Sequence, residues 1–240
     1  MDAMRVLDEA EAADVRAEVL VHDLNNLLNV VLAAAEALAL QAPPGTDTHE
    51  LARISQSAAE RGGVLLRKLA DLSGDAPAPA EGVDCAEALV TTARLANVTT
   101  SGTVTVVARG MSAPLACRAD RADLESALLN LCVNAAHAMP RGGVIQISAY
   151  PRRPTDACAR RLGLAPNLYA AFSVSDPGLG MTPEVLANAV RPGFSTRKGR
   201  GGRGLGLAGV ADFARRSGGA LDLASTLGRG TTATLYLPLA

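Results

Sequence analysis

Alternating glycines, a strand-end aspartate and two asparagines four residues apart are the parts of this sequence best suited to chemistry. The glycines Gly202, Gly204 and Gly206 lie in the run GGRGLGLAGV at 201–210. Lacking side chains, they let backbone N–H groups approach a polyphosphate, and the apolar run that follows predicts a helix whose N-terminus attracts anions. The run alone is a weak signal, because glycine-rich loops also serve as plain turns.

Asn130 and Asn134 occupy positions i and i+4 of a strongly helical segment, so they share one helix face. Their carboxamide oxygens suit Mg²⁺, which keeps several waters and takes phosphate oxygens as further ligands. Asn134 is the better candidate for a metal ligand. Taken singly, both asparagines would more often be caps or surface residues.

Asp176 ends an apolar, strand-like segment and opens the sequence DPGLGM. A carboxylate accepts hydrogen bonds without donating one, which fits the exocyclic amine of adenine. Gly178 and Gly180 would let the backbone turn tightly beside the ring. A simple strand-end turn is the ordinary interpretation of such a motif in isolation.

His22 stands before Asp23 in VHDLNNLL. With an ordinary pKa of ~6.5, its imidazole is mostly neutral at pH 7 and offers a free nucleophilic nitrogen. Asp23 could hold the proton of the other nitrogen, and Asn26, one helical turn later, could position a water. A bare His-Asp pair is usually part of a polar helix surface, so the assignment depends on the rest of the chain.

In this order, HDLNNLL, the asparagine segment LESALLNLCVNAAHAMP, DPGLGM and GRGLGL resemble the H, N, G1 and G2 boxes of a bacterial sensor histidine kinase core. The resemblance covers roughly Val19 to Leu239. It implies His22 as phosphoacceptor, Asp23 as general base and Asn26 as an aid to phosphatase action, with ATP and Mg²⁺ as cofactors. The residues it assigns to the nucleotide are Asn130, Asn134, Asp176, Gly178, Gly180, Lys198, Gly202, Gly204, Gly206 and Thr231.

Three further segments extend the resemblance. FSTRKG at 194–199, with Lys198, resembles the F-box before a lid over the phosphates, and GRGTT at 228–232, with Thr231, resembles the closing box. Related ATPases of the Bergerat fold have a glutamate base where this chain has Asn130, which favours transfer to histidine over hydrolysis. The Arg- and Pro-rich excursion from Pro151 to Asn167 resembles the insertion of HDxNNLL hybrid kinases.

The function this implies is a histidine protein kinase that autophosphorylates His22 and passes the phosphoryl group to an aspartate on a response-regulator receiver domain, with phosphatase activity as an option. The alternative is a non-enzymatic histidine phosphotransfer protein, which usually has eroded nucleotide boxes. An ATP-hydrolysing, chaperone-like protein is a distant third. The legible N, G1, F and G2 boxes favour the kinase.

The elements that must position these residues begin with two helices. The segment from Glu9 to Leu40 is free of Gly and Pro, and PPG at 43–45 ends it. A second helix starts near Asp47, a candidate N-cap with Glu50 three residues on. Its apolar stripe, interrupted at Gly62, is Leu51, Ile54, Ala58, Leu65, Leu69 and Leu72. One hairpin buries such a stripe poorly, so we expect a homodimer with a four-helix bundle.

Residues 74–82 predict a linker, so the expected domains are 1–73, a dimerisation and phosphoacceptor hairpin, and 83–240, a catalytic ATP-binding domain. The second domain predicts helices at 84–96, 120–138, from 184 to 189 and at 206–217, and strands at 103–107, 144–150, 170–175, 221–225 and 231–238. The fold class is therefore α+β: a helical hairpin followed by a mixed, mainly antiparallel α/β sandwich of the Bergerat type, with helices on one face.

The composition limits the kinds of partner and compartment that we expect for this chain. With a net charge of −1 and no Trp, a nucleic-acid surface is not expected. The four cysteines lack metal-ligand spacing and indicate a reducing compartment. No apolar run reaches the ~20 residues of a membrane span, so we expect a cytoplasmic protein without direct membrane insertion. A separate sensory protein is a further partner left open.

Overall fold

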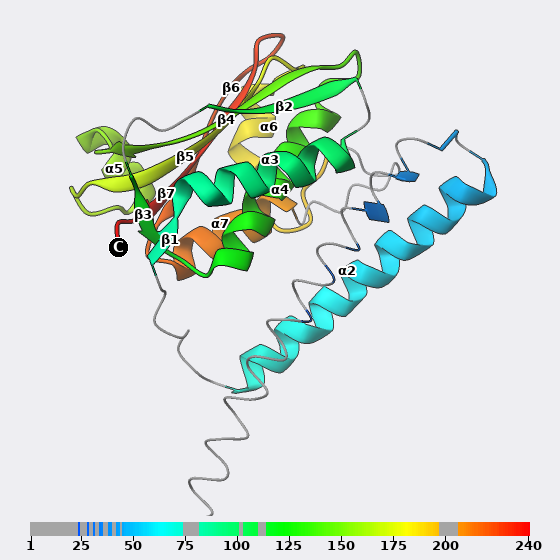
Figure 1. Cartoon of the computed structure of the whole chain (residues 1–240), viewed down its shortest axis with the longest axis horizontal. Helices are drawn as coiled ribbons and strands as arrows, with labels where there is room; N and C mark the ends of the chain where they lie inside the picture. The colour runs from blue at the N-terminus through cyan, green and yellow to red at the C-terminus, as the bar shows by residue number, and fades with distance from the viewer. Residues whose placement is uncertain are drawn as a thin grey trace, which may run out of the picture. The chain divides into compact units, whose positions relative to one another are not determined.

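The computed structural model describes residues 24, 28, 31, 34–35, 38–39, 42–43, 45–73, 82–100, 103–109, 114–196 and 206–240, and the side chains of 60–61 and 64–73 are not described. The chain divides into two compact units, 1–78 and 79–240. Each unit is described by itself (Figure 1).

The first unit contains helix α2 (Asp47–Ser73). The described residues between 24 and 39 are also helical, as expected for the first helix. The predicted N-cap was wrong by one position. The hydroxyl of Thr46 accepts a hydrogen bond from the backbone N–H of His49 at 3.3 Å, so Thr46 caps the helix and Asp47 lies in its first turn. His49 in turn hydrogen-bonds the carbonyl of Ala39 through Nδ1 at 3.1 Å, a structural role.

The apolar stripe of α2 is interrupted at Gly62, where the two helices contact each other. A Cβ at Gly62 would lie 2.8 Å from Cδ1 of Leu28, so the missing side chain makes room for the leucine. Ala52 and Ala59 are buried on the same helix. The start of the predicted apolar stripe is not covered within the single chain, where Leu51 is 63% exposed and Ile54 is 58% exposed.

The second unit is built on a five-stranded sheet of order β2-β4-β5-β7-β6. Strands β2 (Val104–Arg109) and β4 (Gly143–Arg152) are parallel, and β5 (Tyr169–Asp176), β7 (Gly230–Pro238) and β6 (Ala220–Thr226) add antiparallel pairs. The mixed, mainly antiparallel sandwich expected from the sequence is confirmed.

Three helices cover one face of this sheet: α3 (Cys85–Thr99), α4 (Arg121–His137) and α7 (Gly206–Arg216) (Figure 1). The short helix α6 (Pro183–Asn188) follows β5. Alternate residues of the strands point toward the helices, so Ile145, Ile147 and Phe172 are fully buried, while Val144 and Gln146 on either side of Ile145 are exposed. Cys132 is buried on α4.

The excursion at 151–167 contains an unpredicted helix, α5 (Asp156–Leu162). Thr155 caps its start, and Gly163 ends it in the left-handed conformation with φ 68°. Leu162, Leu164 and Tyr150 pack against Tyr169, Ala171 and Tyr236. Tyr150, Ala171 and Tyr236 lie in register across β4, β5 and β7. These tyrosines alternate with the residues that face α4, so α5 covers the end of the opposite, otherwise open face.

A two-stranded sheet of β1 (Gly82–Asp84) and β3 (Ala116–Arg118) was also missed. Strands of three residues leave too little periodicity to be recognised. Gly82, expected in the linker, pairs with Arg118, and the side chain of Asp84 caps α3. Within the part of the chain that the structure describes, no helix combines the length and apolarity needed to cross a bilayer.

Candidate nucleotide site

Asp176 is the last residue of β5 and lies opposite Thr231, the second residue of β7. Along their strands, both residues alternate with residues of the open face, which α3, α4 and α7 do not cover. Asp176 and Thr231 therefore point toward the helices. The side chain of Asp176 is only 7% exposed. A carboxylate this buried at the end of a strand can offer a directed acceptor to a ligand entering between the sheet and the helices.

Two backbone groups hold the Asp176 carboxylate. Its Oδ1 accepts a hydrogen bond from the N–H of Gly178 at 2.8 Å. Burial raises the pKa of Asp176 above its ordinary value, and hydrogen bonds from the N–H groups of Gly178 and Thr231 oppose that rise. Thr231 therefore braces the carboxylate through its backbone.

The loop after Asp176 is fixed to its neighbours through main-chain contacts. The N–H of Leu179 donates to the carbonyl of Ala138 at 2.9 Å, and the carbonyl of Leu179 accepts from Gly228 at 2.7 Å. Gly180 has φ 64°, and a Cβ there would overlap the carbonyl oxygen of Thr226. The loop is thereby joined to the end of α4 on one side and to the β6–β7 hairpin on the other.

Ser225 also contacts the site, and no motif of the sequence points to it. Its hydroxyl accepts a hydrogen bond from the N–H of Met181 at 2.9 Å and lies 3.0 Å from the carbonyl of Gly230 and 2.8 Å from Oγ1 of Thr231. It joins the DPGLGM loop to the start of β7. Serine within a strand has no motif of its own, and only the paired hairpin shows the role.

Asn134 of the asparagine segment and Gly206 of the glycine-rich run lie close together. A Cβ at Gly206 would lie 3.3 Å from Nδ2 of Asn134, because α7 starts against α4. Asn130 lies one turn earlier and is half-buried, as is Asn134, while Leu128, Leu131 and Ala135 face the core. Asn134 thus stands at the N-terminal end of α7, where the helix favours negative charge.

Six of the predicted site residues lie outside the described residues: His22, Asp23, Asn26, Lys198, Gly202 and Gly204. His137 is half-buried at the end of α4. The described residues contain no group of three or more His, Cys, Asp or Glu side chains able to hold a metal ion. A cation at Asn134 would therefore depend on amide and phosphate oxygens.

The arrangement has two ends. Asp176, Gly178 and Thr231 form a polar end, where a buried and oriented carboxylate is suited to accept a hydrogen bond from a donor such as a purine amine. Asn134 and the start of α7 form an end suited to phosphates. The carbonyl of Ala138, at the end of α4, connects them.

Known proteins resemble this chain in sequence and fold. Residues 119–240 match the family of histidine kinase-, DNA gyrase B- and HSP90-like ATPases. The chain is 31% identical to the sensor histidine kinase ZraS of Klebsiella oxytoca over 219 residues, covering 91% of this chain and 44% of ZraS. It is 32% identical to the histidine protein kinase DivJ of Caulobacter vibrioides, covering 100% of this chain and 40% of DivJ.

The fold is shared with full-length ShkA, crystallised in complex with AMPPNP, at a TM-score of 0.59 and 23% identity, covering 94% of this chain and 46% of that one. The chain spans less than half the length of each of these relatives. The resemblance to a sensor histidine kinase core drawn from the sequence is confirmed. The chain belongs to the histidine kinase-, DNA gyrase B- and HSP90-like ATPase family, and its second unit is an ATP-binding domain of that family.

Proposed function

We propose that this chain is an ATP-dependent protein-histidine kinase that phosphorylates its own His22 and passes the phosphoryl group to an aspartate of a response-regulator receiver domain. The observation that carries the proposal is the buried carboxylate of Asp176, oriented by Gly178 and Thr231 and connected through Ala138 to the helix of Asn130 and Asn134. The kinase names of ZraS and DivJ support it.

In this proposal Asp176 accepts a hydrogen bond from the adenine amine, and Gly178 and Gly180 let the loop turn beside the ring. The triphosphate extends toward Asn134 and the start of α7. Lys198, Gly202, Gly204 and Gly206 close over it. The positive end of α7 and the backbone N–H groups of the glycines offset the phosphate charge.

The residues present fit a magnesium ion. The donor set is right for a hard cation, since Asn134 offers an amide oxygen at the phosphate end and Gly206 leaves the space beside it open. Mg²⁺ bound there would neutralise charge on the transferring phosphoryl group. Asn130, in place of a carboxylate base, leaves water without an activating group and so favours transfer to an imidazole.

At the phosphoacceptor, the free nitrogen of His22 attacks the γ-phosphorus of ATP, the bond from that phosphorus to the β,γ-bridging oxygen breaks, and ADP leaves. Asp23 holds the proton on the other nitrogen and stabilises the imidazolium that forms. Asn26, one helical turn away, positions water for dephosphorylation of the partner. Its amide cannot act as a base, so its part is orientation.

We further propose that the hairpin of residues 1–73 is the dimerisation domain, joined by residues 74–82 to the catalytic domain. The described apolar side chains of the hairpin support this. Leu24, Val31 and Leu38 are spaced by seven residues on the first helix and are all about half exposed, as are Leu51 and Ile54 on α2. Exposed stripes at this spacing are what a second hairpin covers in a four-helix bundle.

The test is incubation with γ-labelled ATP and Mg²⁺, comparing the unchanged chain with His22→Gln and with His49→Gln as the matched control. We expect label that survives base and is lost in acid, absent from His22→Gln and retained in His49→Gln. Label that persists in His22→Gln would assign the phosphoryl group to another residue.

The same experiment separates the alternative functions. A chain that binds no ATP but takes label from a phosphorylated receiver is a phosphotransfer protein. Release of inorganic phosphate without labelled protein indicates an ATPase. In the kinase, Asn26→Ala keeps most autophosphorylation and loses phosphatase activity toward the receiver.

A further inference from the structure

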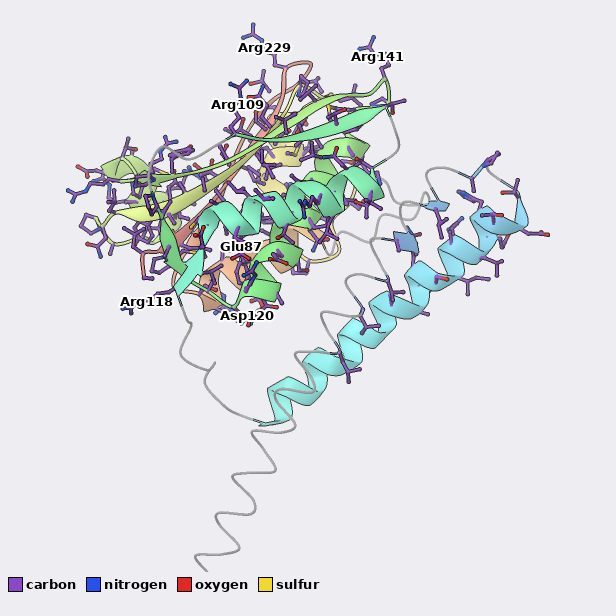
Figure 2. The ribbon with its side chains drawn as sticks, in the orientation of Figure 1. Glu87, Arg109, Arg118, Asp120, Arg141 and Arg229 are labelled. Carbon is purple, nitrogen blue, oxygen red and sulfur yellow. The ribbon has the colours of Figure 1, made fainter. Side chains whose placement is uncertain are left out.

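Asp176, Thr231 and Ser225 form a row across three strands of the sheet. Asp176 of β5 is paired with Thr231 of β7, and Thr231 is paired with Ser225 of β6. Residues paired across neighbouring strands point to the same side, so all three side chains lie on the helical face. The tip of the β6–β7 hairpin carries Arg229, which projects away from the second unit (Figure 2). The contacts with Asp176 therefore come from the base of this hairpin.

The hydroxyl of Ser225 has one proton, and its partners decide where that proton lies. The backbone N–H of Met181, at 2.9 Å, can only donate to the hydroxyl oxygen. The carbonyl of Gly230, at 3.0 Å, can only accept, so it takes the proton of Ser225. The hydroxyl of Thr231, at 2.8 Å, must then donate its own proton to Ser225. One hydrogen bond donated and two accepted occupy every position around the Ser225 oxygen.

Thr231 is left with lone pairs and no proton to offer a ligand. Its hydroxyl carries a single proton, which is directed at Ser225. Thr231 is half-buried, and its N–H donates to the carboxylate of Asp176, so the two side chains are neighbours. The carboxylate also accepts hydrogen bonds without donating one. A ligand that reaches this end of the site therefore meets two acceptors side by side.

The hydroxyl pair of the open face has no such fixed direction. Ser175 and Thr232 are paired there, with their hydroxyl oxygens 3.0 Å apart. Either of them can donate to the other, because no backbone carbonyl within the described residues takes the proton of Ser175. The direction at Thr231 is therefore a consequence of the Gly230 carbonyl beside Ser225, and not of a serine–threonine pair as such.

We propose that Ser225 is a positioning residue for base selectivity: it keeps the hydroxyl of Thr231 an acceptor, so that the site selects purine nucleotides with an amine at position 6. The inference rests on the placement of adenine at Asp176 in the proposed function. An amine has two protons and can supply both Asp176 and Thr231. A base without the amine leaves both acceptors unpaired, and a site built to bind an N–H discriminates strongly against such an analogue. Ser225 acts through Thr231, since its own hydrogen-bonding positions are all occupied.

The test measures two affinities of the full chain by calorimetry, one for ADP and one for purine riboside diphosphate, which is ADP without the amine. Neither nucleotide can phosphorylate the protein during the titration. The variants are Ser225→Ala, Thr231→Val and the two combined, with Ser225→Thr as the conservative replacement. Ser175→Ala is the matched control, because it removes the hydroxyl of the equivalent pair on the open face. Circular dichroism checks that each variant is folded.

The unchanged chain should prefer ADP by about a hundredfold. Thr231→Val removes an acceptor that only the amine uses, so this preference should fall about tenfold. In Ser225→Ala the loss of the Met181 contact weakens both nucleotides, whereas the freed Thr231 hydroxyl weakens only ADP, so the preference should fall about threefold. Ser225→Thr should restore it, and Ser175→Ala should leave it unchanged. With Thr231→Val already present, Ser225→Ala should change the preference no further.

The preference, and not either affinity alone, decides the result. A purely structural Ser225 would lower both affinities by the same factor, so an unchanged preference in Ser225→Ala overturns the proposal. An unchanged or larger preference in Thr231→Val means that Thr231 donates its proton to the base, and this overturns the proposal even if Ser225→Ala does not fold. Both outcomes leave the proposed kinase standing. If the unchanged chain binds neither nucleotide, the proposed function fails as well.

Discussion

Neighbouring threonines of β7 show how differently the two faces of one sheet are used. Thr231 points toward the helices, where its hydroxyl is 2.8 Å from Ser225 and its N–H supports the buried Asp176. Thr232 points to the open face, where its hydroxyl is 3.0 Å from Ser175. The same hydroxyl pair therefore occurs twice, one residue apart. Only the pair on the helical face lies in the network that shapes the nucleotide site, so position in the network rather than residue type decides the role.

The largest expected effect comes from a comparison of two glycines with left-handed backbone conformations, Gly180 at the nucleotide site and Gly163 on the open face. Gly180→Ala forces a Cβ onto the Thr226 carbonyl, so we expect about 3–4 kcal/mol of lost stability and loss of ATP binding. Gly163→Ala, with a similar φ but nothing within 4 Å of the Cβ, should cost only about 1 kcal/mol. Denaturant unfolding measures both, and equal losses would mean that the loop contact at Gly180 has no special importance.

Next in size is the removal of a carboxylate. Asp176→Asn keeps the acceptor for Gly178 but can present a donor to the adenine amine, so ATP affinity should fall about ten- to a hundredfold. Asp222→Asn, on the open face, should leave affinity unchanged. Calorimetry with ATP checks both, and an unaltered affinity in Asp176→Asn removes the proposed adenine contact.

Asp176 also predicts a pH dependence of stability. Its folded pKa is raised by burial, so the folded state favours the protonated form. The stability this contributes is present below the ordinary aspartate pKa and is lost as the pH rises through the raised value. The free energy of unfolding of Asp176→Asn, followed across the acidic range, should lack this loss. A steeper fall in the variant would contradict the direction of the shift.

A smaller effect distinguishes the two hydroxyl pairs. Ser225→Ala removes the acceptor for Met181, so we expect about 1 kcal/mol of lost ATP binding, seen as a several-fold rise in KM with kcat nearly unchanged. Ser225→Thr should restore most of it. Ser175→Ala is the matched control and should leave KM alone. A rise in KM for both alanine variants would show that the two faces are equally coupled to the nucleotide.

The smallest effect is expected at the ion pair that fixes α5. Arg161 is 59% exposed and Asp222 is 20% exposed at their side chains, so solvent screens much of the attraction. A double-mutant cycle of Arg161→Ala and Asp222→Ala should give a coupling of about 0.5 kcal/mol. A coupling of several kcal/mol would mean that α5 depends on the ion pair rather than on Leu162.

The strands and long helices could be predicted because their patterns are local. The ends of β4, β7 and α4 were predicted to within a residue or two, from strand alternation for β4 and β7 and from the apolar period for α4. Helix α5 and the β1–β3 pair could not, because seven residues or three carry too little periodicity and their apolar partners are far along the chain. The exposed Leu51 and Ile54 show the same limit, since a stripe does not say which neighbour covers it.

By itself the sequence determined the chemistry that the site can contain. Asp176, the asparagines of α4 and the glycine spacing follow from residue type and order alone. Only the tertiary structure decided which of them meet: Asn134 against Gly206, the Leu179 loop on Ala138, and Ser225 between Met181 and Thr231. It also decided that Arg152 contacts Tyr150 and that Arg161 contacts Asp222 on the open face. Alternation along one strand separates its residues into two faces. Which residues of different strands lie on the same face depends on how strands distant in the sequence pair, and only the tertiary structure shows that register.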